Sequence, residues 1–316
     1  MSFYYLFIDG IGLGGKEDHN PFHVHAKHLF RHLAGEEPGD SVSSQFLCVP
    51  ADAHMGFSGL PQSATGQTSL WTGMNGPASM GRHMTGFPGP TLIRVIEQYS
   101  MIKLLSENGK KAALLNGYSK AYLDRIERKP RLRSASTHVH RASGQPLFLL
   151  EDVLEGRALY MDITHQFLHH FYPDFAGKLP IADPRERGRQ YVKIGREYDL
   201  VLFEYFLTDK AGHNQSMEEA SMTIQILEPF IEGILEEMDP LEDTLVISSD
   251  HGNMEDLSTK THTNNLVPVF LSGKYASDMA GHIKYLYDIP RAIFNCMDFD
   301  SGLPDPLAMA AQPESA

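Results

Sequence analysis

Three acidic residues and three histidines stand where predicted strands end, and these residue types can bind metal ions. They are Asp9, Asp209, His213, Asp250, His251 and His262. Asp209 and His213 have the spacing D-x-x-x-H, which on a helix puts both side chains on one face. Asp250 and His251 are adjacent, and a sharp turn at Gly252 would bring both to one ion. Mixed nitrogen and oxygen ligands suit Zn²⁺ or Mn²⁺ better than Mg²⁺.

Each of these residues also has an ordinary structural interpretation. Asp9 could cap a helix, Asp209 could close a turn, and His262 could be a hydrogen-bonded core histidine. For the six residues considered together, a purely structural role is less plausible. Several acids at one sheet edge repel one another unless cations compensate their charge.

The elements that would position these residues alternate between strands and helices. The predicted strands include FYYLFID, DLVLFEYF, TLVISSD and LVPVFLSG, and the predicted helices between them include PRERGRQYVKIGREY and MEEASMTIQILEPFIEGILEEM. This rhythm predicts an α/β fold, a doubly wound and mostly parallel sheet with helices on both faces. Ligands of such sheets bind at the carboxyl ends of the strands. NPFHVHAKHLFRHL and the stretch 92–108 each predict a single further helix.

The strand and helix rhythm breaks between residues 119 and 183. This stretch begins with the basic segment KAYLDRIERKPRLR and continues with mixed helical and aromatic pieces. We expect residues 1–118 and 184–316 to form a metal-binding catalytic core and residues 119–183 to form a small inserted cap subdomain. Such a cap would cover the carboxyl edge of the sheet.

Composition narrows the classes of function. The net charge of −13 argues against a nucleic-acid partner and against an anionic membrane surface. The two cysteines cannot form a disulfide framework or a zinc ribbon. We find no signal peptide and no transmembrane segment, so a cytoplasmic location is expected. The oligomeric state is not predicted.

Several segments together resemble the alkaline phosphatase superfamily of metal-dependent phosphoryl and sulfuryl transfer enzymes. They are FIDGIG, GLPQSATGQTSLWTG, TDKAGH, SSDHGNMED and THTNNLVP, which run in the family's order from the first strand almost to the C-terminus. The chain looks most similar to the branch that holds cofactor-independent phosphoglycerate mutase and phosphopentomutase.

The resemblance implies two divalent metal ions and a serine nucleophile. Asp209, His213 and His262 would hold one ion, whereas Asp9, Asp250 and His251 would hold the other. QSATGQTSLWTG offers Ser63, Thr65, Thr68 and Ser69 as nucleophiles. Ser63 precedes a glycine by three residues, as the mutase nucleophile does, and the Thr-Gly pair that follows it in sulfatases and nucleotide pyrophosphatases is Thr72-Gly73 here. Both comparisons select Ser63, which would also contact a metal ion.

The resemblance implies a phosphatase-like or phosphodiesterase-like hydrolase that acts on a small phosphorylated metabolite through a phosphoserine. A phosphoglycerate-mutase-like phosphotransferase and a non-catalytic metal-binding protein are the alternatives. The longer DRDNRW-like insert of the mutases and the Pro and Arg of the sulfatase signature are missing. Candidate substrate-binding residues, each equally able to form a solvated surface, are Lys120, Arg125, Arg131, Arg133, Asp162 and His165.

Overall fold

The computed structural model describes residues 1–36 and 45–309, and its centre is one six-stranded sheet. The strand order is β2-β6-β5-β1-β4-β3. Their bounds are β1 Phe3–Ile8, β2 Leu47–Ala51, β3 Ala112–Leu114, β4 Leu200–Tyr205, β5 Thr244–Ser248 and β6 Val267–Gly273. β3, β4, β1 and β5 are parallel, and β6 runs antiparallel to both of its neighbours. The predicted mostly parallel α/β sheet is confirmed.

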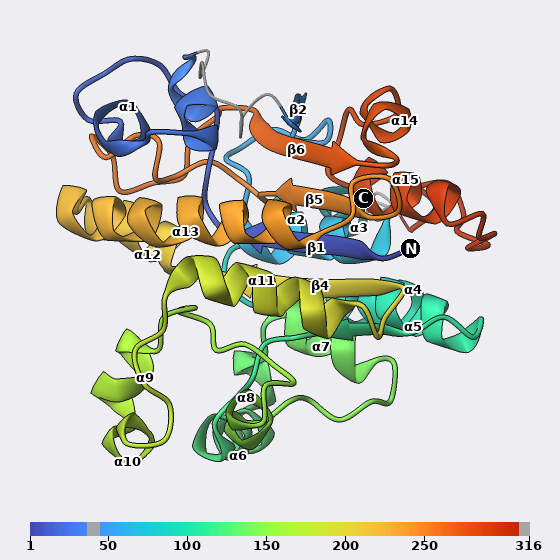
Figure 1. Ribbon diagram of the computed structural model, residues 1–316. Coiled ribbons are helices and arrows are strands. Elements are labelled where there is room, and N and C mark those ends of the chain that lie inside the picture. The colour runs from blue at the N-terminus through green and yellow to red at the C-terminus, as the bar shows by residue number, and fades with distance from the viewer. Residues whose placement is uncertain (37–44, 310–316) are drawn as a thin grey trace.

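Helices cover both faces of this sheet (Figure 1). On one face, α11 (Pro184–Gly195) and α13 (Met217–Glu237) bury Tyr191 and Phe230 against alternate strand residues such as Phe203. The other face carries α2 (Ser63–Thr72), α4 (Pro90–Tyr99), α5 (Met101–Glu107) and α15 (Asp288–Cys296). The remaining short helices of the core are α3 (Gly76–Met80), α12 (Leu207–Asn214) and α14 (Ala276–Ala280).

Two predicted helices are each divided in the structure. NPFHVHAKHLFRHL forms α1 (Pro21–His25) and the 3₁₀ helix η1 (Leu29–Ala34), and 92–108 falls in α4 and α5. Ser100 breaks the latter, because its backbone leaves the helical region (φ −49°, ψ 124°) and its side chain accepts the N–H of Lys103 as the cap of α5. The apolar periodicity continues across the break, so the sequence pattern alone does not reveal it.

Residues 119–183 contribute helices and no strand of the sheet. These helices are α6 (Lys120–Arg128), η3 (Pro130–Leu132), α7 (Ala135–Arg141), α8 (Leu150–Leu154), α9 (Gln166–Phe171) and α10 (Pro173–Ala176). Most of them lie together in the lower part of Figure 1, where Leu150, Tyr160 and Leu168 belong to a separate hydrophobic cluster. In contrast, α7 packs on the core through Ala135 and Val139.

The carboxyl ends of β1, β4 and β5 meet at one edge because these strands are adjacent and parallel. Asp9 directly follows β1, Asp250 and His251 follow β5 after one further residue, and α12 begins just beyond β4. In the described ranges, no helix is both long and apolar enough to cross a membrane.

Candidate metal centre and active site

Asp9 and Asp250 lie side by side at the shared strand edge and are held by one amide. Gln67 Nε2 donates to Asp9 Oδ2 and to Asp250 Oδ2, each at 3.1 Å. Gln67 lies in α2, four residues after Ser63, so one helical face carries both side chains. Two carboxylates 241 positions apart are therefore joined through a helix that also carries the candidate nucleophile.

His251 is fully buried beside these two carboxylates and Ser63. Its Nε2 lies 3.5 Å from Asp9 Oδ1, 3.4 Å from Asp250 Oδ2 and 3.0 Å from Ser63 Oγ. Burial, followed by the neighbouring His262, lowers the pKa of His251 to about 3. The ring is therefore neutral at ordinary pH, and a neutral imidazole can donate a lone pair to a metal ion.

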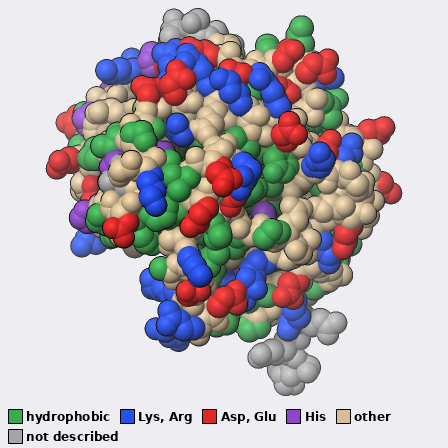
Figure 2. Space-filling model, turned by 60° about the horizontal axis from the view of Figure 1, so that its bottom comes forward, with side chains coloured by type: hydrophobic (Ala, Val, Ile, Leu, Met, Phe, Trp, Pro, Cys, Tyr) green, Lys and Arg blue, Asp and Glu red, His purple; other side chains and the backbone are tan. Residues whose placement is uncertain are grey.

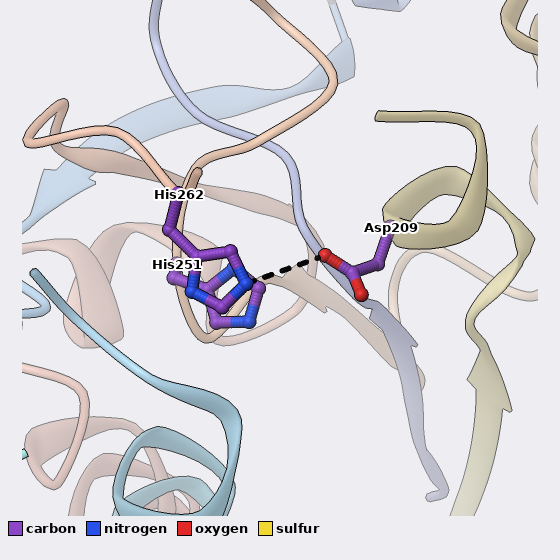
Figure 3. A group of neighbouring side chains, drawn as sticks. All are labelled: Asp209, His251 and His262. Atoms are coloured by element: carbon purple, nitrogen blue, oxygen red, sulfur yellow. Dashed lines mark ion pairs between the residues drawn. The ribbon is translucent and has the colours of Figure 1, made fainter. Parts of the chain in front are cut away.

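Asp209, His213 and His262 form a second cluster next to the first. His213 Nε2 lies 3.3 Å from Asp209 Oδ2, and His262 Nε2 lies 3.8 Å from Asp209 Oδ1. The rings of His262 and His251 stack with their centroids 3.6 Å apart. Figure 3 shows this stack and the Asp209 carboxylate, which points toward it from the start of α12. The two clusters are thus contiguous.

The hydrogen bonds of His213 and His262 determine which ring nitrogen carries the proton. His262 Nδ1 lies 2.8 Å from the Pro61 carbonyl oxygen, and His213 Nδ1 lies 2.9 Å from that of Lys260. A carbonyl oxygen only accepts, so each Nδ1 is the protonated nitrogen and each Nε2 is left with a lone pair. These two Nε2 atoms face each other at 3.3 Å. Such a pair repels in the absence of a cation.

The buried carboxyls also favour bound cations. Burial and repulsion by Asp250 raise the pKa of Asp9 well above its usual range, and burial and Asp209 raise that of Asp250 to about 7. Asp9 Oδ1 is buried and has no hydrogen-bond partner among the described residues. Divalent cations compensate charges placed in this way. Asp9, Asp250 and His251 are spaced closely enough to share an ion, and so are Asp209, His251 and His262. The donor set fits divalent metal ions.

The structure separates the four hydroxyl groups that the sequence left as candidate nucleophiles. The hydroxyls of Thr65, Thr68 and Ser69 each donate to a backbone carbonyl within or just before α2. Ser63 is the first residue of that helix, and its Oγ is directed at His251. The N-terminus of a helix presents free N–H groups and a positive dipole, which favour a bound phosphoryl group.

Gly66 allows α2 to approach the strand edge closely. A Cβ at this position would lie 2.9 Å from both Asp250 Cβ and the Asp250 carbonyl oxygen. Any larger residue would therefore push the helix away from Asp250, and Ser63 would move with it.

Comparison with known proteins shows which family part of the chain resembles. The model of the metalloenzyme superfamily matches residues 185–301, which include five of the six acidic and imidazole side chains described above. This part of the chain is similar to that superfamily. The chain is 26% identical over 126 residues to a 2,3-bisphosphoglycerate-independent phosphoglycerate mutase of Methylobacillus flagellatus, a match covering 38% of this chain and 24% of the relative.

A second mutase with the same description, from Pyropia yezoensis, is 31% identical over 91 residues, or 27% of this chain and 17% of the relative. The matches thus span about a quarter or less of these curated relatives. An alkaline phosphatase from the Antarctic bacterium TAB5 shares the fold with a TM-score of 0.56 at 11% identity, covering 95% of this chain and 98% of that one. A protein from Pyrococcus horikoshii shares the fold with a TM-score of 0.53 at 14% identity, and the match covers 94% of this chain and 96% of that one. The resemblance to the alkaline phosphatase superfamily is confirmed.

A cavity of about 710 Å³ opens beside Ser63 and extends toward α6. Of the six candidate substrate-binding residues, only Arg125 lines it. Lys120 and Arg131 are exposed elsewhere, and Arg133 forms an ion pair with Glu127.

Asp162 and His165 lie apart from this cavity. Asp162 is buried, accepts the backbone N–H groups of His165 and Phe167, and lines a smaller cavity of about 270 Å³. His165 Nδ1 binds the Pro180 carbonyl oxygen.

Three residues at the site were not predicted. Asn253 Nδ2 donates to Asp209 Oδ1 at 2.7 Å, and Gln67 joins the two aspartates. Glu204 lines the large cavity from β4. The helical spacing from Ser63 could have indicated Gln67, and the position next to DHG could have indicated Asn253. Glu204 is the single charged residue of an otherwise apolar and aromatic strand, and that contrast could have indicated it.

Proposed function

We propose that this metalloenzyme is a two-metal phosphohydrolase that acts on a small phosphorylated metabolite through a phosphoserine at Ser63. Asp209, His213 and His262 would hold one ion, and Asp9, Asp250, His251 and Ser63 the other, with Zn²⁺ or Mn²⁺ preferred over Mg²⁺. The observation that carries the proposal is the direction of Ser63 Oγ, which lies 3.0 Å from His251 Nε2. His251 belongs to both groups of residues that could share an ion.

Ser63, the N-terminus of α2, Gln67 and Asn253 each have a role in this reaction. Ser63 loses its proton as Oγ forms a bond to phosphorus, and the ester oxygen leaves and takes up a proton to give the alcohol. Water then attacks the phosphoserine, which releases inorganic phosphate and restores the serine hydroxyl. The α2 N-terminus binds the phosphoryl oxygens in both steps. Gln67 and Asn253 orient Asp9, Asp250 and Asp209. Divalent ions would lower the pKa of the serine hydroxyl and neutralise phosphoryl oxygens.

Hydrolysis is favoured over transfer back to the substrate because water can reach the site. The side chain of His213 is 46% exposed at the edge of the cavity. Exclusion of water is what a mutase requires. We also propose that residues 119–183 act as a cap that selects the substrate, although α7 within this stretch packs on the core. Cytoplasmic action is part of this proposal.

The test compares Ser63→Ala with Ser58→Ala, which makes the same change at a nearby exposed serine. With Zn²⁺ or Mn²⁺ present, we expect Ser63→Ala to reduce phosphate release from an aryl phosphate by at least ~10³-fold and to keep the bound metal. Ser58→Ala should retain the activity of the parent protein. Undiminished turnover by Ser63→Ala would refute the nucleophile.

Two further readouts separate the alternatives. Interconversion of phosphoglycerates without release of phosphate would establish the mutase. Bound metal without turnover of any phosphomonoester or phosphodiester would establish the non-catalytic metal-binding protein.

A further inference from the structure

The large cavity has mainly aromatic and apolar walls. Its volume of about 710 Å³ lies within the range of roughly 300–1,000 Å³ that is typical of sites enclosing drug-sized ligands. Six aromatic side chains line it: Phe87, Tyr118, Tyr122, Tyr160, Tyr172 and Phe206. A site built for a very small, highly charged ester would not need this much apolar surface.

Two of these tyrosines stack on each other where the core joins the cap. The rings of Tyr118 and Tyr122 stack with centroids 5.3 Å apart and planes 14° from parallel. Tyr172, on the opposite segment, is held by a hydrogen bond of 2.7 Å between its hydroxyl and Ser119 Oγ. An ordered aromatic surface of this kind accepts the face of a planar ring. Figure 2 turns the lower part of Figure 1 forward and shows hydrophobic side chains between acidic and basic groups on that face.

Glu204 supplies a buried acceptor in the same cavity. Its backbone is held on both sides by Asn116, whose Nδ2 donates to the Glu204 carbonyl oxygen and whose Oδ1 accepts the Glu204 N–H. Ser136 Oγ donates to Glu204 Oε2 at 2.6 Å, and no donor among the described residues reaches Oε1. A ligand hydroxyl or amino group is the natural partner for that oxygen.

Few charged side chains line the cavity outside the candidate metal ligands. Among the residues that the structure describes they are Glu204, Arg125 and Lys210. Lys210 also lies 4.9 Å from the centroid of the Phe167 ring.

We propose that the substrate's leaving group carries an aromatic or heteroaromatic ring and a hydrogen-bond donor, as in a nucleoside monophosphate or a hydroxylated aryl phosphate. The ring lies on an outer face of the Tyr118–Tyr122 stack, and the donor binds Glu204. This inference rests on the proposed phosphohydrolase function, in which ester and water give the free alcohol or phenol and inorganic phosphate.

The first measurement is kcat/KM of the metal-loaded protein for adenosine 5′-monophosphate, phenyl phosphate, glycerol phosphate and 3-phosphoglycerate. Ring-bearing esters should exceed the aliphatic ones by at least ~10-fold. Equal or higher values for the aliphatic esters would overturn the inference. Glu204→Gln should lower kcat/KM for adenosine 5′-monophosphate but not for phenyl phosphate, because only the former has ribose and amino donors. Equal effects on both esters would overturn the contact with Glu204.

The second measurement uses Tyr122→Leu, which keeps apolar volume and removes the ring. Tyr285→Leu is its matched control, since Tyr285 stacks on Tyr287 away from the cavity. Tyr122→Leu should lower kcat/KM at least ~10-fold for ring-bearing esters and at most ~2-fold for glycerol phosphate, whereas Tyr285→Leu should change neither. An equal loss on all esters would contradict the ring site.

Equilibrium dialysis of adenosine separates this inference from the proposed function. If no ester releases phosphate, the proposed function fails, but adenosine binding that Tyr122→Leu weakens at least ~10-fold would still support the ring site. Absence of that binding, or binding unaffected by Tyr122→Leu, would overturn it.

Discussion

Ser63 Oγ lies 3.0 Å from His251 Nε2, although 188 positions separate the two residues. The contact exists because the first turn of α2 packs against the carboxyl end of β5. Gly66 permits this approach and Gln67 secures it through hydrogen bonds to Asp9 and Asp250. The position of one hydroxyl group therefore depends on the packing of a whole helix.

Gly66→Ala should impair activity even though it substitutes none of the candidate ligands. The added Cβ would contact Asp250 at 2.9 Å, and a helix displaced by about 1 Å can cost on the order of 10²-fold in rate. Gly177→Ala is the control, because nothing lies within 4 Å of its added Cβ and its φ is −77°. Steady-state assays with metal analysis test this, and an unchanged rate in Gly66→Ala would contradict the close approach.

Removal of metal should lower the stability of the folded protein. A ligand that binds only the folded state at 100 times its Kd contributes about 2.7 kcal/mol. With metal present, the parent protein should be more stable than Asp250→Asn. Without metal, Asp250→Asn should be the more stable protein, since it removes one buried negative charge beside Asp9 and Asp209. Thermal unfolding of both proteins, with chelator and with Zn²⁺, measures this. A chelator-treated Asp250→Asn protein less stable than the chelator-treated parent would contradict the repulsion.

His138 should make the protein sensitive to acid. Burial, followed by Arg133, lowers the pKa of His138 from 6.5 to about 4, and its Nε2 has no partner among the described residues. Between those pH values the unfolded chain binds a proton that the folded chain does not. Stability is therefore fully present above pH 6.5 and falls as the pH drops toward 4, by about 2–3 kcal/mol.

Urea unfolding between pH 7.5 and 4.5 tests this sensitivity in His138→Gln. The variant should lose less stability on acidification than the parent protein. His170→Gln, at an exposed histidine of the same segment, should follow the parent. Parallel curves for all three proteins would exclude His138 as the cause.

Arg125→Ala should raise KM by about tenfold with a smaller effect on kcat. Arg125 lines the cavity and has no carboxylate at ion-pair distance among the described residues, so its guanidinium can bind a substrate oxygen. Arg131→Ala removes the same charge from an exposed position outside the cavity and should change KM less than twofold. Equal effects of the two variants would indicate only a general electrostatic contribution.

The local sequence was sufficient to predict the sheet and the ligand candidates. Parallel buried strands are nearly continuous apolar runs, so a polar residue such as Asp9 or Asp250 directly after one is conspicuous. The spacing of Asp209 and His213 indicates a shared helical face without any knowledge of the fold. These signals are local, and the alternation of strands and helices then predicts the common edge.

The tertiary structure decided what surrounds those ligands. The break at Ser100 depends on one side-chain cap within a continuous apolar pattern, and the orientation of Ser63 depends on the contact between Gly66 and Asp250. Glu204 faces the cavity because Asn116 and Ser136 from other elements hold it there. Candidate metal ligands can be recognised in the sequence from their residue types and spacing. The shape of a substrate cavity cannot, because its walls come from segments that are distant in the sequence and meet only when the chain packs.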